Sequence, residues 1–227
     1  MATMRLEKQE NVYLLTLNHG ERANTMTDAV LDEYHAALDE VEASQGNTAL
    51  VITSEDPKFF SNGIDLEYIK SKGMEYLFSH FGARLDQLLM RVALINFPTI
   101  ACVTGHAYGG GALLASACDF RTMRADRGFF CFPEVDIKLA FTPAMLASVN
   151  LLRNEQLRFE MALTGRPVGG EEAAKRGIVD AAFGAEDLLP KTLAMAAQLA
   201  TKDRRTYAQI KRDMRQHLLP LVDESRR

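Results

Sequence analysis

Short apolar runs along this chain alternate with longer stretches in which apolar residues recur at helical spacing. Residues 4–8 and 12–17 predict two strands, and residues 48–53 predict a short buried strand. A helix before the third strand is indicated by five apolar residues at helical spacing: Val30, Leu31, Tyr34, Leu38 and Val41. The repeated order of strand and helix is typical of an α/β fold.

The second half of the chain continues this alternation and ends in helices. Residues 74–95 predict a long amphipathic helix. Its apolar stripe consists of Leu77, Phe81, Leu85, Leu88, Leu89 and Val92. Later helices are expected at residues 143–152, 155–163, 171–176, 188–200 and 204–219. The chain therefore ends in a helical section.

The central stretch, residues 97–120, predicts a strand at 99–103, a glycine-rich turn and a buried helix from Ala112 to Cys118. Gly109, Gly110 and Gly111 allow close backbone approach, and the first N–H groups of the helix have no partner inside it. Three interpretations remain open. The turn can hold a phosphate, although the Lys and Ser/Thr of a P-loop do not follow; it can form an oxyanion site; or it can serve close packing alone.

Two further loops contain candidate functional residues. In the loop over residues 58–69, a turn at Asn62 and Gly63 can present the N–H of Ile64. In the other loop, Pro133 places Glu134 just beyond an apolar run, with Asp136 two residues later. A solvated turn acid is the general expectation for Glu134, whereas a dry site would raise its pKa toward the range of a general base.

Composition narrows the function classes. With 227 residues and 47% hydrophobic residues, the chain suits one domain with a substantial core. A net charge of −4 gives no general attraction to nucleic acid. Cys102, Cys118 and Cys131 lie in apolar surroundings without a C-x-x-C pair, which is typical of buried thiols in a reducing compartment. No signal-peptide core or membrane-length apolar run is found, so a cytoplasmic location is the default expectation.

Taken together, FFSNGIDL, GHAYGGGALLASACDF, FPEVDI and TGRPVGGEEAAKRGIVDAAF resemble the crotonase, or enoyl-CoA hydratase/isomerase, superfamily. The resemblance implies a spiral of strand-strand-helix turns over residues 1–185. It also implies a C-terminal helical region over 186–227 that helps to form trimers or dimers of trimers. The implied substrates are acyl-CoA thioesters, with no metal and no cofactor beyond the coenzyme A of the substrate.

The resemblance also implies roles for individual residues. The N–H groups of Ile64 and Gly110 match the family's two oxyanion donors. Of the two glutamates used by the family's hydratases, one position is Leu113 here and the other is Glu134. The residues expected around the CoA thioester are Asn62, Gly63, Ile64, Asp65, Leu66 and Gly110.

One base suffices to move a double bond, so we expect a 3-enoyl-CoA to 2-enoyl-CoA isomerase of fatty acid β-oxidation. MRADRGFFCFPEVDI likewise resembles the plant-type monofunctional Δ3,Δ2-enoyl-CoA isomerases. A divergent hydratase, another crotonase-type enzyme such as a dehalogenase or hydrolase, and a catalytically silent acyl-CoA-binding protein remain alternatives. Arg22 and Lys58 are candidates for contacts with the CoA phosphates by loop position alone.

Overall fold

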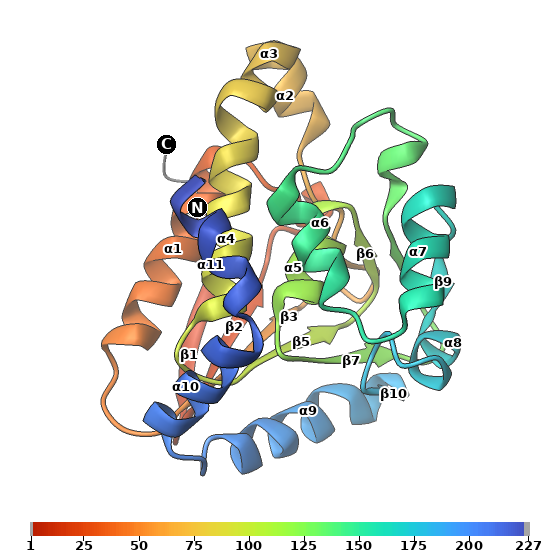
Figure 1. Cartoon of the computed structure of the whole chain (residues 1–227). Coiled ribbons are helices and arrows are strands. Elements are labelled where there is room, and N and C mark those ends of the chain that lie inside the picture. Colours follow the sequence, from red (N-terminus) through yellow and green to blue (C-terminus); the bar gives the residue numbers. More distant parts are fainter. Residues whose placement is uncertain (1, 225–227) are drawn as a thin grey trace.

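The computed structural model describes residues 2–224, and the larger of its two sheets has six strands (Figure 1). Its strand order is β1-β2-β3-β5-β7-β10, and all neighbours are parallel except the β1–β2 hairpin. The strands are β1 (Met4–Gln9), β2 (Val12–Leu17), β3 (Ala49–Ser54), β5 (Thr99–Val103), β7 (Phe120–Arg124) and β10 (Ala181–Phe183).

A smaller sheet of four strands has the order β4-β6-β8-β9. It consists of β4 (Phe59–Ser61), β6 (His106–Tyr108), β8 (Phe129–Cys131) and β9 (Val168–Gly169). Each of three successive pairs, β3–β4, β5–β6 and β7–β8, places its first strand in the large sheet and its second strand in the small one. This repeated passage between the sheets is the predicted spiral of strand-strand-helix turns.

Helices cover both faces of the large sheet (Figure 1). The longer ones are α1 (Asp28–Ala43), α4 (Gly82–Leu94), α5 (Gly110–Ala117), α6 (Pro143–Asn150), α7 (Glu155–Thr164), α9 (Ala185–Leu199) and α10 (Arg204–Met214). The shorter ones are α2 (Leu66–Lys72), α3 (Met74–Tyr76), α8 (Gly170–Lys175) and α11 (Leu219–Glu224). Within residues 2–224, no helix is long and apolar enough to cross a membrane.

The strand register explains why the strands are apolar on both sides. Leu14 is paired with Val51, and both belong to the hydrophobic cluster between the large sheet and α9. Their neighbours Leu15 and Ile52 are also paired, but belong to the main core on the opposite face, with α1, α4 and α5. Strands buried on both faces form continuous apolar runs rather than alternating patterns.

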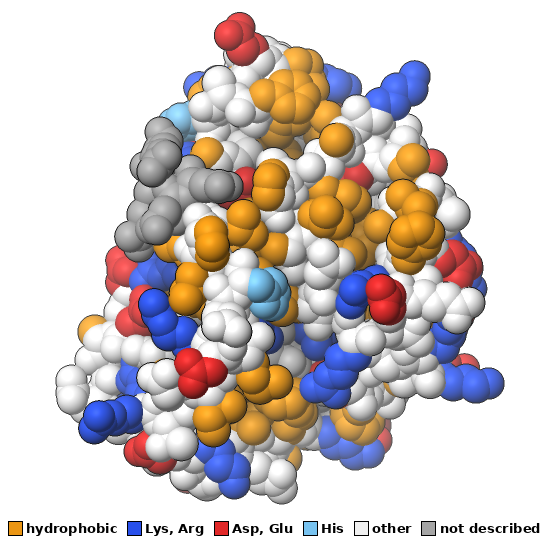
Figure 2. All heavy atoms as spheres, in the orientation of Figure 1, with side chains coloured by type: hydrophobic (Ala, Val, Ile, Leu, Met, Phe, Trp, Pro, Cys, Tyr) orange, Lys and Arg blue, Asp and Glu red, His pale blue; other side chains and the backbone are white. Residues whose placement is uncertain are grey.

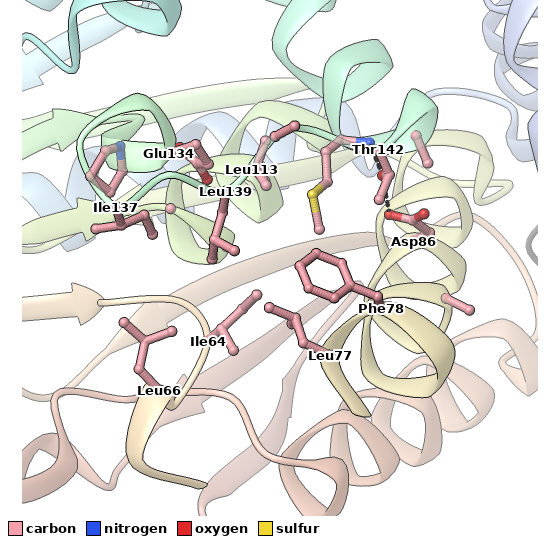
Figure 3. Close-up of a pocket in the computed structure, with 18 of the residues that line it drawn as sticks. Ile64, Leu66, Leu77, Phe78, Asp86, Leu113, Glu134, Ile137, Leu139 and Thr142 are labelled. Carbon is pink, nitrogen blue, oxygen red and sulfur yellow. Dashed lines mark hydrogen bonds between the residues drawn. The ribbon is translucent and has the colours of Figure 1, made fainter. Parts of the chain in front are cut away.

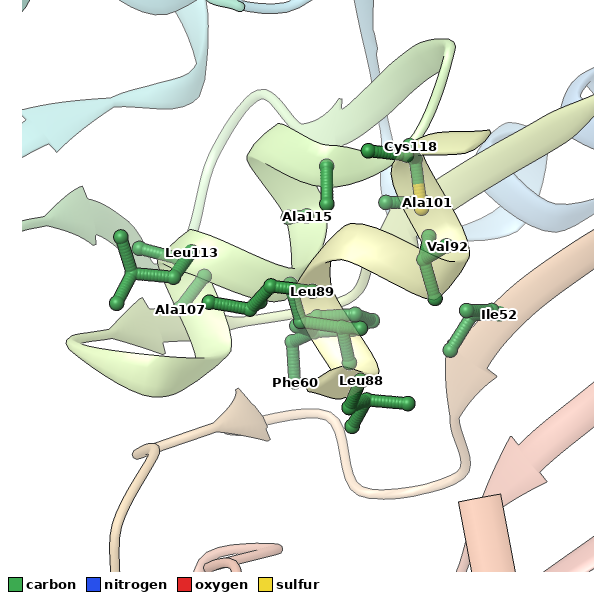
Figure 4. Close-up of a cluster of buried hydrophobic side chains, with 14 of the residues drawn as sticks. Ile52, Phe60, Leu88, Leu89, Val92, Ala101, Ala107, Leu113, Ala115 and Cys118 are labelled. Carbon is green, nitrogen blue, oxygen red and sulfur yellow. The ribbon is translucent and has the colours of Figure 1, made fainter. Parts of the chain in front are cut away.

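Helix α5 lies at the centre of the main core, and all of its residues are buried. Figure 4 shows Leu113 and Ala115 of α5 beside Leu89 and Val92 of α4. Because its surroundings fix α5 so firmly, the peptide groups at its N-terminus are held by the packed interior rather than by a mobile loop.

Several sequence predictions need correction. The strand β6 lies between β5 and the helix, where a turn alone was expected, and α5 begins at Gly110 rather than Ala112. The expected helix over 74–95 includes a π-helical turn at Leu77–Phe81, and the last expected helix is interrupted by a 3-10 turn at Gln216–Leu218. These differences are local. Three-residue strands and changes of helical pitch leave little periodic signal.

The C-terminal helices are attached to the core through a buried carboxylate. Asp119 lies directly after α5 and accepts a hydrogen bond from Lys211 Nζ at 2.9 Å. Tyr207 donates to the same carboxylate at 3.0 Å, and Arg215 forms an ion pair with it at 3.0 Å. The side chains of Lys211 and Asp119 are 5% and 7% exposed, so this contact connects α10 to the interior.

Candidate active site

A cavity of about 450 Å³ lies between the loop before α2, the N-terminus of α5 and the loop before α6 (Figure 3). Most of its lining is apolar. It includes Leu66, Leu77, Phe78, Leu113, Ile137, Leu139 and Met145. The polar side chains in the lining are Asn62, Asp86, Tyr108, Glu134 and Thr142. Of the predicted site residues, Asn62, Ile64, Leu66, Gly110 and Glu134 all line this cavity.

The loop before α2 is fixed by backbone hydrogen bonds on both sides of Ile64. The N–H of Met26 donates to the carbonyl of Gly63 at 2.7 Å, and the N–H of Asp65 donates to the carbonyl of Met26 at 3.0 Å. These two bonds form an isolated parallel bridge between Met26 and Ile64, which does not use the N–H of Ile64. That N–H has no hydrogen-bond partner within residues 2–224.

The glycine turn brings a second N–H next to the first. Gly109 has φ +49°, a left-handed conformation, and Gly110 is the first residue of α5. The N–H of a first helical residue has no intrahelical acceptor. A Cβ atom built on Gly110 would lie 3.5 Å from the nitrogen of Ile64. The two peptide groups are therefore neighbours, beside a helix end that carries partial positive charge.

Glu134 lies in a 3-10 turn, Pro133–Val135, and is only 8% exposed. A Cβ atom built on Gly109 would be 3.5 Å from Oε1 of Glu134, and Oε2 is buried without a partner in the part of the chain described. Burial raises the pKa of Glu134 to about 7. The expectation of a solvated turn acid is thus wrong for Glu134, but it holds for Asp136, which is exposed.

Leu113 lines the same cavity and is 1% exposed. It stands on α5 one turn after Gly110, at the position that the resemblance matches to the first glutamate of the hydratases. Its side chain is aliphatic, so this wall supplies no proton donor or acceptor.

Asp86 is a second carboxylate of the cavity that the sequence analysis missed. It belongs to α4, is 9% exposed, and accepts a hydrogen bond from Thr142 Oγ1 at 2.7 Å. Burial raises the pKa of Asp86 to about 6, and the Thr142 hydrogen bond offsets this only partly. Asp86 is three residues before Leu89 and seven before Ala93, which places it on the apolar face of the predicted helix. An acid on an apolar face is the sequence feature that could have identified Asp86 as a buried residue.

Four other candidates are not among the lining residues: Gly63, Asp65, Arg22 and Lys58. Asp65 caps α2 by accepting from the N–H of Tyr68 at 2.9 Å, and it forms an ion pair with Arg22 at 2.7 Å. The ammonium of Lys58 lies 4.8 Å from the ring centre of Phe59.

Comparisons with known proteins show the family and the fold of this chain. The family model for enoyl-CoA hydratase/isomerase matches residues 7–225. The peroxisomal enoyl-CoA delta isomerase 1 of Arabidopsis thaliana is 34% identical over 79% of this chain and 74% of its own. A probable enoyl-CoA hydratase of Mycobacterium leprae is 31% identical over 89% of this chain and 77% of its own length. The crystal structure of an enoyl-CoA hydratase/isomerase family protein from Pseudomonas syringae has a TM-score of 0.89 at 25% identity, over 98% of this chain and 94% of that one. The chain therefore belongs to the enoyl-CoA hydratase/isomerase family and has the crotonase fold.

Proposed function

We propose that the protein isomerises 3-enoyl-CoA to 2-enoyl-CoA, with Glu134 as its single general base. The thioester oxygen of the substrate would accept hydrogen bonds from the N–H groups of Ile64 and Gly110. Asn62, Gly63, Asp65 and Leu66 would shape the loop around the thioester. The observation that carries this proposal is the position of one buried carboxylate, Glu134, beside two neighbouring N–H groups. Oε2 of Glu134 and both N–H groups have no hydrogen-bond partner among residues 2–224.

In the proposed reaction, ionised Glu134 removes a proton from C2. The electron pair of the C–H bond is delocalised over the thioester carbonyl and the C3–C4 double bond. Negative charge therefore develops on the thioester oxygen as a dienolate forms. Protonated Glu134 then returns the proton to C4, and the double bond comes to lie between C2 and C3. Preorganised backbone donors of this kind typically contribute about 3–4 kcal/mol each to the stability of such an oxyanion.

Hydration of 2-enoyl-CoA is the alternative function, and Asp86 is the observation in its favour. Addition of water calls for groups that position the water and move its proton, and Asp86 is a second carboxyl group in the cavity. Figure 3, however, places Glu134 and Asp86 at opposite ends of the cavity, with Leu113 and Leu139 between them. This separation favours isomerisation, because a hydratase needs both groups at the same pair of carbons.

Incubation of the purified protein with 3-enoyl-CoA tests the proposal directly. We expect the ultraviolet absorbance of the conjugated 2-enoyl thioester to appear. In a parallel incubation with 2-enoyl-CoA, a hydratase would remove that absorbance. If loss of the 2-enoyl thioester is faster than its formation from 3-enoyl-CoA, hydration is the main activity and the proposal is wrong.

A further inference from the structure

We propose that Asp86 recognises a hydroxyl group on the acyl chain, so that the preferred substrates are hydroxylated enoyl-CoA thioesters. This inference rests on the proposed acyl-CoA site and adds the chemical class of the acyl group. Asp86 has no part in the isomerisation itself, because Glu134 alone serves as the base there.

The surroundings of Asp86 argue against a purely structural carboxylate. Buried carboxylates in folded proteins are normally paired with a cation, because an isolated buried charge is costly. No ion pair to Asp86 is found in the described part of the chain. Its Oδ1 accepts from Thr142, whereas no donor to Oδ2 is found among residues 2–224. Asp86 therefore lines the cavity with one carboxylate oxygen to which no described residue donates.

The place of Asp86 in the cavity fits a contact with the acyl chain. Glu134 and the N–H groups of Ile64 and Gly110 would hold the reacting end of the thioester. Asp86 lies across the cavity from Glu134, near Phe78 (Figure 3). A chain that extends from the reacting carbons along the apolar wall would reach Asp86 beyond C4.

The expected donor is a neutral hydroxyl rather than an ammonium group. The rest of the lining is mostly apolar, so a charged substrate group would lose its hydration without a second polar partner. A neutral hydroxyl loses less hydration free energy than a charged group when it enters the cavity. Its hydrogen bond to a carboxylate is worth about 1.5–3 kcal/mol.

The test compares a plain 3-enoyl-CoA with matched thioesters that carry one hydroxyl at successive carbons beyond C4. We expect one hydroxylated substrate to have a kcat/KM about 10- to 100-fold above that of the plain one. Asp86→Leu, which is similar in size, should abolish this preference while the plain substrate is still isomerised. Asp86→Asn, which can still accept from Thr142, should weaken it.

Thr142→Val is the matched control. It removes the bond between α4 and the start of α6 but leaves the carboxylate in the cavity, so the hydroxyl preference should persist. If Asp86 only connects the two helices, Asp86→Leu and Thr142→Val will lower both kcat/KM values in proportion and leave their ratio unchanged. That result would overturn the inference.

Binding measurements separate this inference from the proposed reaction. Calorimetry with saturated acyl-CoA and with its hydroxylated counterparts needs no turnover. A wild-type protein that binds the hydroxylated thioester more tightly, with the difference lost in Asp86→Leu, supports the inference even if no isomerase activity is found. Equal affinities at every hydroxyl position would overturn it, whatever the activity.

Discussion

A Cβ atom built on Gly63 would lie 2.4 Å from the peptide nitrogen of Gly110. The turn before α2 and the N-terminus of α5 are thus in direct backbone contact, and only a residue without a side chain fits between them. Gly63 also has φ +74°, which other residues rarely adopt. The relative position of the two proposed oxyanion donors depends on this contact.

Gly63→Ala should therefore separate the two donors. The methyl group would also lie 2.8 Å from the carbonyl oxygen of Tyr108, so backbone must move. We expect kcat/KM for 3-enoyl-CoA to fall by at least about 10²-fold, in line with the loss of an oxyanion donor. Gly46→Ala is the control, because Gly46 has φ +79° but no atom within 4 Å of a built Cβ. Activity that survives in Gly63→Ala would contradict the proposed geometry.

Glu134→Gln should lower kcat for isomerisation by about 10²–10⁴-fold with little change in KM, because it removes the base but keeps the shape of the side chain. Steady-state kinetics on 3-enoyl-CoA measures both constants. Asp136→Asn is the control, since Asp136 is the nearest acid in sequence and is exposed. The base is misassigned if Asp136→Asn abolishes the activity and Glu134→Gln does not.

The oligomeric state stays a prediction, and we expect a trimer or hexamer. Leu193 and Leu199 of α9 pack against the cluster between α9 and the large sheet, while Ile210 of α10 is 55% exposed. Figure 2 shows other hydrophobic side chains on the face formed by α6 and α7, where Phe159 is 65% and Leu163 is 58% exposed. Closed symmetric oligomers commonly cover such faces. A monomer mass by light scattering at micromolar concentration would refute the prediction.

The elements themselves could be predicted because their signal is local. All five residues of the predicted stripe on α1 are buried, and so are all six on the helix over 74–95. Asp65 caps α2, and Asp is a residue type that commonly begins helices. Of the two adjacent aromatic residues on the small sheet, Phe60 is fully buried and Phe59 only half-buried, a difference that a local apolar pair does not reveal.

The candidate site could be predicted only in part, because burial of a polar side chain depends on segments distant in sequence. Glu134 lies in a turn whose composition suggests exposure, and it is buried only because α5 and the chain before α6 pack around it. Asp86 becomes a cavity residue only when Thr142, 56 residues later, lies beside it. No pattern within either segment carries that information.

Asp119→Ala should destabilise the protein strongly. It would leave Lys211, which is buried, without its carboxylate partner, and unpaired buried charges cost about 3–5 kcal/mol. Urea unfolding should show a loss of this order. Replacing both residues, as in Asp119→Leu with Lys211→Met, should recover part of the loss, because the buried ammonium is then removed as well. Arg215 also loses its ion pair with Asp119, but it keeps its hydrogen bonds to the carbonyls of Ala93 and Ala117. If the double variant is as unstable as Asp119→Ala alone, the charge is not the cause.

The buried carboxyl of Glu134 should also make the stability of the protein depend on pH. The folded pKa is raised from 4.5 to about 7, so below about pH 4.5 the group is protonated in both the folded and the unfolded protein and has no effect. Between these values the unfolded chain ionises first, and the free energy of unfolding falls as pH rises. Above about pH 7 the loss of stability stays constant. It amounts to about 3 kcal/mol, because each unit of difference between the folded and unfolded pKa corresponds to about 1.36 kcal/mol.

Glu134→Gln cannot ionise, so it should lack this contribution. Relative to the wild-type protein, its free energy of unfolding should increase from pH 4.5 to pH 7 and then level off. Denaturant titrations of both proteins across this pH range measure the difference between their free energies of unfolding. The contributions of all other titrating groups cancel in this difference. A difference that does not change with pH would mean that Glu134 has an ordinary pKa in the folded protein. An acid that titrates normally would then be solvated, and the dry site on which the proposed base depends would not exist.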